Sequence, residues 1–175
     1  GLIGSGARYR LPTDREWSAA VGLPREQGAT PKERDEKNQE HFPWVGPFPP
    51  SGSAGNYGDA RFERALLNDL ELTVNGSELD GYEDGYGYTA PVGRFEANMY
   101  GLHDLGGNVW EWCEDWYSGD REKRVLRGGS WSFNPRVSLL SSLRDGITPT
   151  ARISNFGFRC VLAVGGSTGR LASEE

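Results

Sequence analysis

The sequence predicts one α+β domain with few helices, short strands and much irregular loop. The chain has 175 residues, which is the size of an ordinary domain and enough to bury a core. It contains 25 glycines, about twice the usual share of ~7%. Six Trp, seven Tyr and seven Phe compensate for a low content of aliphatic residues. Together these observations indicate a turn-rich fold with a core of aromatic side chains and short strands.

A helix is predicted over Asp14–Val21. Thr13 precedes it and Glu16 follows three residues later, which is the spacing of a capping box. In this box each side chain satisfies a main-chain amide that the helix itself leaves unpaired. Gly22 is expected to end the helix because glycine adopts the left-handed conformation without steric cost.

Long loops separate this helix from the strands. Residues 27–53 are polar and then rich in proline, and residues 56–95 carry Gly, Asp and Tyr at short intervals. A loop of that length inside a compact domain is usually functional or ordered by an ion. Strand patterns return at Asn108–Trp116, Arg124–Gly129 and Phe156–Val164. Residues 165–175 are small or charged and are expected to form a flexible tail.

The charge distribution argues against two classes of partner. The net charge is −6, and the positive residues are scattered among a larger number of acids. Nucleic-acid binding requires clustered Lys and Arg, and the acidic stretch 69–84 would repel phosphate. No run approaches the ~20 apolar residues of a membrane span. We therefore expect neither nucleic-acid binding nor membrane insertion.

The two cysteines, Cys113 and Cys160, are too few for a thiolate zinc site or a disulfide scaffold. Each lies in or beside a strand-like run. They are either small buried hydrophobic residues or a single disulfide, and their spacing leaves both possibilities open.

Four motifs occur in order between Tyr9 and Arg159. Any one is a weak signal, but all four with reasonable spacing are highly specific. They are Tyr9-Arg10-Leu11-Pro12-Thr13 with Glu16-Trp17, Thr89-Ala90-Pro91-Val92-Gly93, Gly107-Asn108-Val109-Trp110-Glu111-Trp112 with Asp115-Trp116, and Arg127-Gly128-Gly129-Ser130-Trp131 closed by Gly157-Phe158-Arg159. Together they resemble the formylglycine-generating-enzyme, or sulfatase-modifying-factor, family.

This resemblance implies a variant of the C-type lectin fold with short twisted antiparallel strands, few helices and much irregular loop. Residues 8–164 would form the domain. Family members usually have a strand and a helix before the Arg10-Leu11-Pro12-Thr13 segment, and this sequence has neither. The sequence is thus either a fragment or a minimal form of the domain.

The sequence lacks the catalytic groups of the enzymes it resembles. Those enzymes use two copper-binding cysteines just after the Gly-Gly-Ser-aromatic segment, because the thiolate is both nucleophile and soft metal ligand. Here that position reads Ser132-Phe133-Asn134-Pro135-Arg136. The two histidines, His41 and His103, cannot form the several-His iron site of the related sulfoxide synthases. We expect that the protein is not an enzyme and that it binds no copper.

The resemblance also implies two calcium sites, in which carboxylate, amide and main-chain oxygens bind the ion. Every side-chain ligand that the sites require is an oxygen donor in this sequence. In the alternative interpretation, Asp104 and Glu111 only cap turns and pair with arginines. The first site would use the side chains of Asp104 and Glu111 with the carbonyls of Gly107 and Val109, and the second the side chains of Asn56 and Asp84 with the carbonyls of Tyr57 and Tyr86.

The segment between Ser132 and Gly157 has an unusual composition. It contains no Lys, Glu, Gln, Met or Trp, although Lys and Glu are common elsewhere. Its apolar residues follow neither a strand nor a helix period. The frame of Gly, Pro and Arg residues around them resembles the variable proteins of diversity-generating retroelements, where randomised Asn codons cannot become those five residue types.

This second resemblance implies an exposed and diversified surface, and exposed apolar patches usually mark binding sites. Arg136, Arg144, Arg152 and Arg159 would hold the frame, while Trp110, Trp112, Trp131 and Phe158 lie buried beneath. In the alternative, the segment is ordinary core and loop of an inactive homologue. The predicted variable positions are Ser132, Phe133, Asn134, Val137, Ser138, Leu143, Asp145, Ile147, Ala151, Ile153, Ser154, Asn155 and Phe156.

Two functions are consistent with these observations. The first is a ligand-binding protein that displays a diversified surface on a C-type lectin scaffold and recognises a protein or glycan. Its expected location is the surface of a virion or cell. The second is a catalytically inactive accessory domain of a larger enzyme or signalling protein, without a diversified face.

Overall fold

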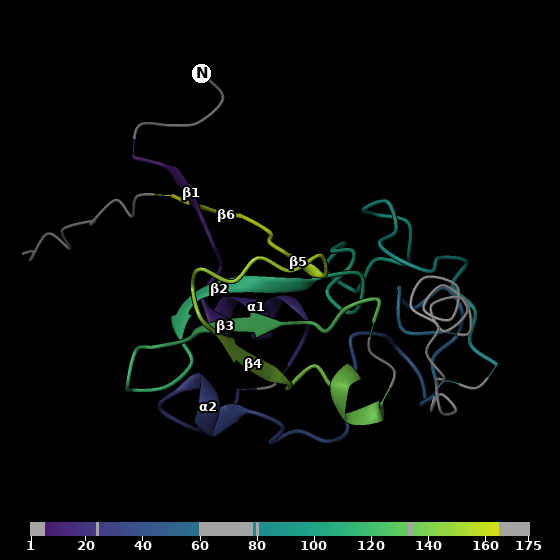
Figure 1. The fold of residues 1–175 in the computed structure, drawn as a ribbon, viewed down its shortest axis with the longest axis horizontal. Coiled ribbons are helices and arrows are strands. Elements are labelled where there is room, and N and C mark those ends of the chain that lie inside the picture. Colours follow the sequence, from purple (N-terminus) through teal and green to yellow (C-terminus); the bar gives the residue numbers. More distant parts are fainter. Residues whose placement is uncertain (1–5, 24, 60–78, 80, 133–134, 165–175) are drawn as a thin grey trace, which may run out of the picture.

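The computed structural model describes residues 6–23, 25–59, 79, 81–132 and 135–164 (Figure 1). Within them, short helices and strands are joined by long irregular segments. In chain order the elements are β1 (Arg8–Arg10), α1 (Asp14–Ala20), α2 (Pro31–Arg34), β2 (Trp110–Trp116), β3 (Arg124–Arg127), the 3₁₀ helix η1 (Arg136–Leu139), β4 (Arg144–Ile147), β5 (Phe156–Gly157) and β6 (Val161–Ala163).

The strands form two small sheets. The larger has the order β4-β3-β2-β5, and the smaller pairs β1 with β6. The pairings are antiparallel except that of β2 with the short β5, which is parallel. Figure 1 shows the β1–β6 pair extending from one side of the larger sheet.

The predicted helix is present as α1 and begins as the sequence indicates. The Thr13 side chain accepts the N–H of Glu16, and the Glu16 carboxylate accepts the N–H of Thr13, which completes the capping box. The helix ends with Val21 as its cap, and Gly22 follows with a φ of +84°. These observations confirm the local prediction at both ends.

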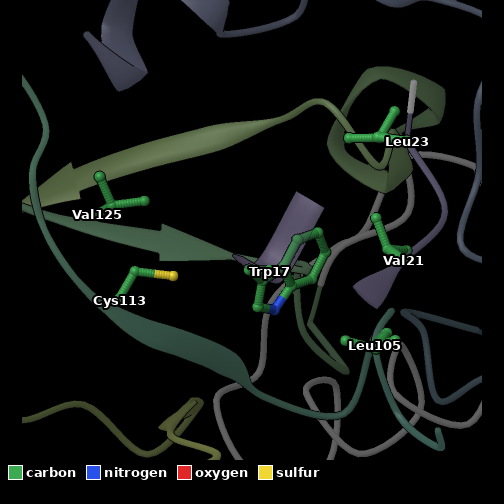
Figure 2. Close-up of a cluster of buried hydrophobic side chains, with 6 residues drawn as sticks. All are labelled: Trp17, Val21, Leu23, Leu105, Cys113 and Val125. Atoms are coloured by element: carbon green, nitrogen blue, oxygen red, sulfur yellow. The ribbon is translucent and has the colours of Figure 1, made fainter. Parts of the chain in front are cut away.

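The core is aromatic, as the composition predicts. One buried cluster places Trp17 of α1 against Cys113 of β2 and Val125 of β3 (Figure 2). A second buried cluster is formed by Tyr57, Leu79, Tyr82 and Leu139, with Phe42, Trp44 and Phe48 packed against it. Rings thus fill spaces that aliphatic side chains fill in most domains.

A buried ionic cluster joins α1 to β3, β4 and α2. Its centre is the Asp14 carboxylate, which pairs with Arg34, Arg127 and Arg144, all of them buried. Glu26 contributes a second carboxylate and accepts hydrogen bonds from Arg144. Buried charges are tolerated when they are paired and hydrogen-bonded in this way.

The structure decides between the alternatives left open for the cysteines and corrects the placement of two aromatic residues. Both cysteines are free, which excludes the disulfide, and only Cys113 is a buried residue, because Cys160 is exposed. Phe158 was expected in the core but is 67% exposed, because it follows β5 where the larger sheet has already ended. Trp112 is half-buried, whereas Trp110 and Trp131 are buried as predicted.

Within the described residues, none of the helices has the length and apolar character needed to cross a bilayer. The predicted tail at residues 165–175 lies outside the described residues.

Candidate functional site

The larger sheet has two faces of different character. We call the face that packs on α1 the inner face. From β2, Glu111 accepts a hydrogen bond from the Trp17 indole at 2.8 Å, and Asp115 accepts one from the main-chain N–H of Asp14 at 2.6 Å. From β3, the Arg127 guanidinium lies over the Trp17 ring. The inner face therefore carries the core cluster around Trp17 and the ionic cluster.

The opposite side of the sheet, the outer face, is identified from the strand register. Residues paired directly across strands project to the same face. Arg124 pairs with both Trp116 and Ile147, and its guanidinium lies 3.6 Å from the centre of the Trp116 ring. Leu126 likewise pairs with Trp112 and with Asp145. These pairs place the β4 positions Asp145 and Ile147 beside two tryptophans.

Phe156 joins the outer face from the other edge of the sheet. It pairs with Trp110, and its ring meets that of Trp112 edge-on with centroids 5.8 Å apart. In the loop before it, Ile153 is 51% exposed and Ser154 is exposed, while Ala151 is half-buried.

A polar cluster lies at the start of this edge. The Asn155 amide donates to the hydroxyl groups of Ser130 and Ser132 at 3.1 and 3.0 Å. Those hydroxyls are 3.0 Å apart. Within the described residues, the buried Oδ1 of Asn155 has no hydrogen-bond partner. The structure thus brings two of the predicted variable positions, Ser132 and Asn155, together.

The remaining variable positions lie elsewhere. Val137 and Ser138 are on η1, which Arg136 anchors by stacking on Phe42 and donating to the Gln39 carbonyl. Leu143 is half-buried just before β4. Phe133 and Asn134 fall outside the described residues. The predicted variable positions therefore divide between the outer face with its loop and the region of η1.

The frame arginines act largely as the sequence predicts. Arg144 donates to Asp14, Glu26 and the Ser142 carbonyl. Arg159 donates to Glu111 and to main-chain carbonyls, and Arg136 binds a carbonyl as described above. Arg152 is exposed and has no described hydrogen bond.

The outer face contains a pocket that the sequence did not predict. This pocket has a volume of about 350 Å³ and is lined by Leu11, Trp112, Cys113, Glu114, Arg124 and Pro149. The alternation of Trp110, Trp112 and Trp116 with acidic residues along β2 could have indicated an aromatic face. The contribution of Arg124 and Pro149 depends on strand register, which sequence alone does not provide.

Some of the side-chain oxygens of the first predicted calcium site already accept hydrogen bonds from other residues of the chain. Both oxygens of Glu111 accept hydrogen bonds from Arg159 at 2.7 Å, which is the pairing that the alternative interpretation expects. One oxygen of Asp104 accepts the N–H of Gly93. Its other oxygen, Oδ1, is buried and has no partner among the described residues.

The segment Gly107–Asn108, which belongs to the first predicted site, packs against the main chain of Asn56. The N–H of Asn108 donates to the Asn56 carbonyl at 2.7 Å. Gly107 has a φ of +74°, and a Cβ there would clash with that same carbonyl. Glycine is therefore required at position 107 for this approach.

Residues of the second predicted calcium site lie close together. The Asp84 carboxylate accepts the main-chain N–H groups of Tyr57 and Tyr86, both at 2.8 Å. Asn56 donates its amide to the Tyr88 carbonyl, while its buried Oδ1 has no partner among the described residues. An unpaired, buried oxygen of this kind is a ligand type that calcium prefers. The oxygens of the two predicted sites that remain available to an ion in this arrangement are therefore Asp104 Oδ1 and Asn56 Oδ1, whereas both oxygens of Glu111 and of Asp84 already accept hydrogen bonds.

Neither site is a cluster of acidic residues. In the described part of the chain, no three His, Cys, Asp or Glu side chains gather where a metal ion could be held. Any calcium at these positions must therefore take main-chain and amide oxygens as well as carboxylates.

The groups needed for copper-dependent oxidation are missing. Ser130 and Ser132 follow Gly129, and no cysteine occurs between Cys113 and Cys160. Cys113 is in the core, where burial raises the pKa of its thiol and so disfavours the reactive thiolate. Cys160 lies in the segment between β5 and β6.

A family model and curated relatives match most of the chain. The model described as the sulfatase-modifying factor enzyme 1-like domain matches residues 3–164. The inactive C-alpha-formylglycine-generating enzyme 2 of Bos taurus is 34% identical over 170 residues, which cover 93% of this chain and 46% of that protein. A formylglycine-generating enzyme of Thermomonospora curvata is 31% identical, with 88% and 49% covered. The chain thus spans about half the length of these relatives.

The fold of the chain is similar to that of a solved structure. PvdO from Pseudomonas aeruginosa matches with a TM-score of 0.53 and 22% identity, covering 89% of this chain and 53% of that one. Treponema denticola variable protein 1 has 29% identity and a TM-score of 0.48, covering 87% and 46%. The predicted fold class, a variant of the C-type lectin fold with few helices and short strands, is confirmed.

Proposed function

Because the chain belongs to the formylglycine-generating-enzyme family, we propose that it is a non-catalytic binding protein that displays a diversified surface on this scaffold. Its ligand is a protein or glycan on another cell or virion, and the protein acts at a virion or cell surface. One observation carries the proposal. The predicted variable positions Asp145, Ile147 and Phe156 share the face of the larger sheet that lies opposite α1 and the ionic cluster.

This arrangement suits a surface that changes its sequence. The inner face holds α1 through Trp17 and the ionic cluster around Asp14, so it contains the interactions on which folding depends. None of the described variable positions is buried. Substitutions at these variable positions would change the surface that contacts a ligand and would leave the packing of the inner face intact.

The absence of the cysteine pair supports a non-catalytic role, because no other residue type supplies both a nucleophile and a soft copper ligand. With a cysteine-containing sulfatase peptide and copper, we expect no aldehyde product above the buffer control. Turnover of the peptide would overthrow this part of the proposal.

We further propose that calcium orders the loops around Asp104 and Asn56. Asp104 and Glu111 would hold one ion with the carbonyls of Gly107 and Val109. At the second site, Asn56 and Asp84 would act with the carbonyls of Tyr57 and Tyr86. Bound calcium would supply positive charge to the unpaired oxygens of Asp104 and Asn56.

The display role is tested by exchanging outer-face residues and measuring stability. Ile153→Ser should change the free energy of unfolding by less than about 0.5 kcal/mol, since the side chain is half exposed. Phe156→Ser should cost about 1 kcal/mol because it removes the ring contact with Trp112. Val125→Ala is the matched core control and should cost about 2 kcal/mol or more. Ile153 and Phe156 variants as destabilised as the control would identify the segment as core.

The neighbouring DNA provides an independent test of diversification. We expect a near-copy of the last coding segment with Asn codons at the variable positions, and a reverse-transcriptase gene nearby. If neither is present, the second candidate function, an inactive accessory domain of a larger protein, is favoured. The similarity to a bovine relative named as inactive already supports that candidate.

A further inference from the structure

We propose that the pocket between Trp112 and Arg124 binds one sugar ring of a neutral carbohydrate. This inference rests on the proposed binding role of the outer face and names the ligand class for part of it. The pocket has a volume of about 350 Å³, near the lower end of the ~300–1,000 Å³ typical of small-molecule sites. It can therefore hold a small ring but not a folded element of a protein.

Trp112 is the aromatic residue that lines the pocket. Trp112 is half-buried, pairs across the sheet with the fully buried Leu126, and is met edge-on by Phe156. Packing on both sides limits the rotation of the indole before any ligand arrives. The face of an indole carries negative partial charge, and the C–H groups on one face of a pyranose carry positive partial charge. Stacking of the two is favourable and needs no charge on the ligand.

Arg124 supplies hydrogen-bond donors in a fixed position. Its guanidinium stacks on the Trp116 ring at 3.6 Å and donates Nη1–H to the Glu114 carbonyl. Arg124 forms no salt bridge with a carboxylate in the described part of the chain. A guanidinium has five N–H donors, so most of them remain available to a ligand. Stacking lowers the entropy that Arg124 loses when it binds.

Glu114 supplies acceptors on the same rim. Its side chain is 53% exposed and lies 3.6 Å from the Arg10 guanidinium. Sugar hydroxyls both donate and accept, so a ring seated on Trp112 can accept from Arg124 and donate to Glu114. An anionic ligand would be attracted by Arg124 but repelled by Glu114 and by the net charge of −6. A purely apolar side chain would use only the indole. A neutral saccharide uses all three groups.

The pocket and its rim differ in their expected variability. None of the residues that line the pocket is a predicted variable position. These lining residues include Leu11, Trp112, Glu114, Arg124 and Pro149. Ile147 and Phe156, which flank Arg124 and Trp112, are predicted variable positions. A constant pocket would thus hold a sugar ring common to many ligands, and the variable rim would select among the glycans that carry it.

The test uses the full chain on an array of neutral oligosaccharides, acidic oligosaccharides and apolar peptides, followed by calorimetric titration of each neutral glycan that binds. Trp112→Ala should weaken that binding by at least about tenfold. Glu114→Gln lies at an exposed position that leaves folding intact, and it should weaken binding several-fold. Tyr100→Ala removes an exposed aromatic ring elsewhere on the surface and should have no effect. Thermal melts establish that each variant is folded.

The outcomes separate this inference from the proposed function. The sugar-ring inference is overturned if the protein binds only acidic glycans or only apolar peptides. It is also overturned if Trp112→Ala and Glu114→Gln both leave the affinity for neutral glycans unchanged. Either result leaves a display role intact. Ile147→Ser and Phe156→Ser should change which neutral glycans bind while the shared ring is still recognised. If these two exchanges leave the selection of glycans unchanged, the diversified-surface proposal fails while the pocket stands.

Discussion

Replacing Asp14 by asparagine is expected to destabilise the fold strongly at neutral pH. The carboxylate is fully buried, at 2.9 Å from Arg34 Nη2 and 3.1 Å from Arg144 Nε, and it also pairs with Arg127. Asparagine keeps the volume but removes the charge, so of the three buried guanidinium groups only that of Arg144 keeps an ion pair among the described residues, with Glu26. Breaking a buried ion pair on one side typically costs about 3–5 kcal/mol. We expect a loss of that size in the free energy of unfolding.

The cost of this replacement should depend on pH. Burial by itself raises the pKa of Asp14, but the charges of Arg127 and Arg144 and hydrogen bonds from Arg144 and Arg34 outweigh burial and lower the pKa to about 2. A carboxylate with a depressed folded-state pKa stabilises the protein above its unfolded pKa, near 4, and loses this contribution as pH falls through 2. The shift corresponds to about 2 kcal/mol. The difference between wild type and Asp14→Asn should shrink by that amount between pH 5 and pH 2.

Urea denaturation of both proteins at several pH values measures this difference. Asp120→Asn is the matched control, because Asp120 is an exposed carboxylate whose replacement should change stability by less than about 0.5 kcal/mol. A cost for Asp14→Asn below about 1 kcal/mol at pH 7, or a cost that does not fall on acidification, would refute the view that this ionic cluster holds the fold together.

Three further predictions follow from the sites described above. A calcium chelator should lower the melting temperature of the protein, since an ion that binds only the folded state stabilises that state. Asp104→Ala should reduce this response to chelator. An unchanged melting temperature with chelator would contradict the calcium proposal. A thiol reagent should label the exposed Cys160 in the native protein and should label Cys113 only after unfolding. Burial shields the Cys113 thiol and raises the pKa of that thiol. Rapid labelling of both thiols in the native protein would contradict the structure. Thr13→Ala should cost about 1 kcal/mol in urea denaturation through loss of the helix cap, and an unchanged midpoint would show that the cap contributes nothing.

The parts of the fold that the sequence predicted are those encoded locally. The capping box and Gly22 define α1 within a few residues, and the alternation around Trp110 and Trp112 indicates β2. By contrast, β1 and β4 were not predicted, because each is short and carries charged residues that have little strand preference. Pairing with β6 and β3 makes them strands.

The candidate site depends even more on long-range contacts. Gly146 interrupts any strand pattern in β4, yet it is needed there because a side chain would collide with the Tyr117 ring. Asp14 and Arg144 are separated by 130 residues, and nothing near either one in the sequence identifies the other as its partner. Family resemblance suggested the proposed calcium ligands and the frame arginines, but it could not reveal that Trp112 and Arg124 line one pocket.

Strand alternation explains how one short strand serves both stability and recognition. In β4, Arg144 projects to the inner face and binds Asp14, while its neighbour Asp145 projects to the outer face and is exposed. Successive residues of a strand point to opposite sides, so a change at Asp145 does not reach the ionic cluster. Under the proposed mutagenesis, only positions that began as Asn codons vary, and Arg144 belongs to the constant frame. The same alternation in β3 places Arg127 on the inner face and Leu126 on the outer face, where Leu126 is nevertheless fully buried and part of the core. Under the proposed display role, the exposed positions of the outer face could therefore vary while the inner face and the buried Leu126 maintain the fold.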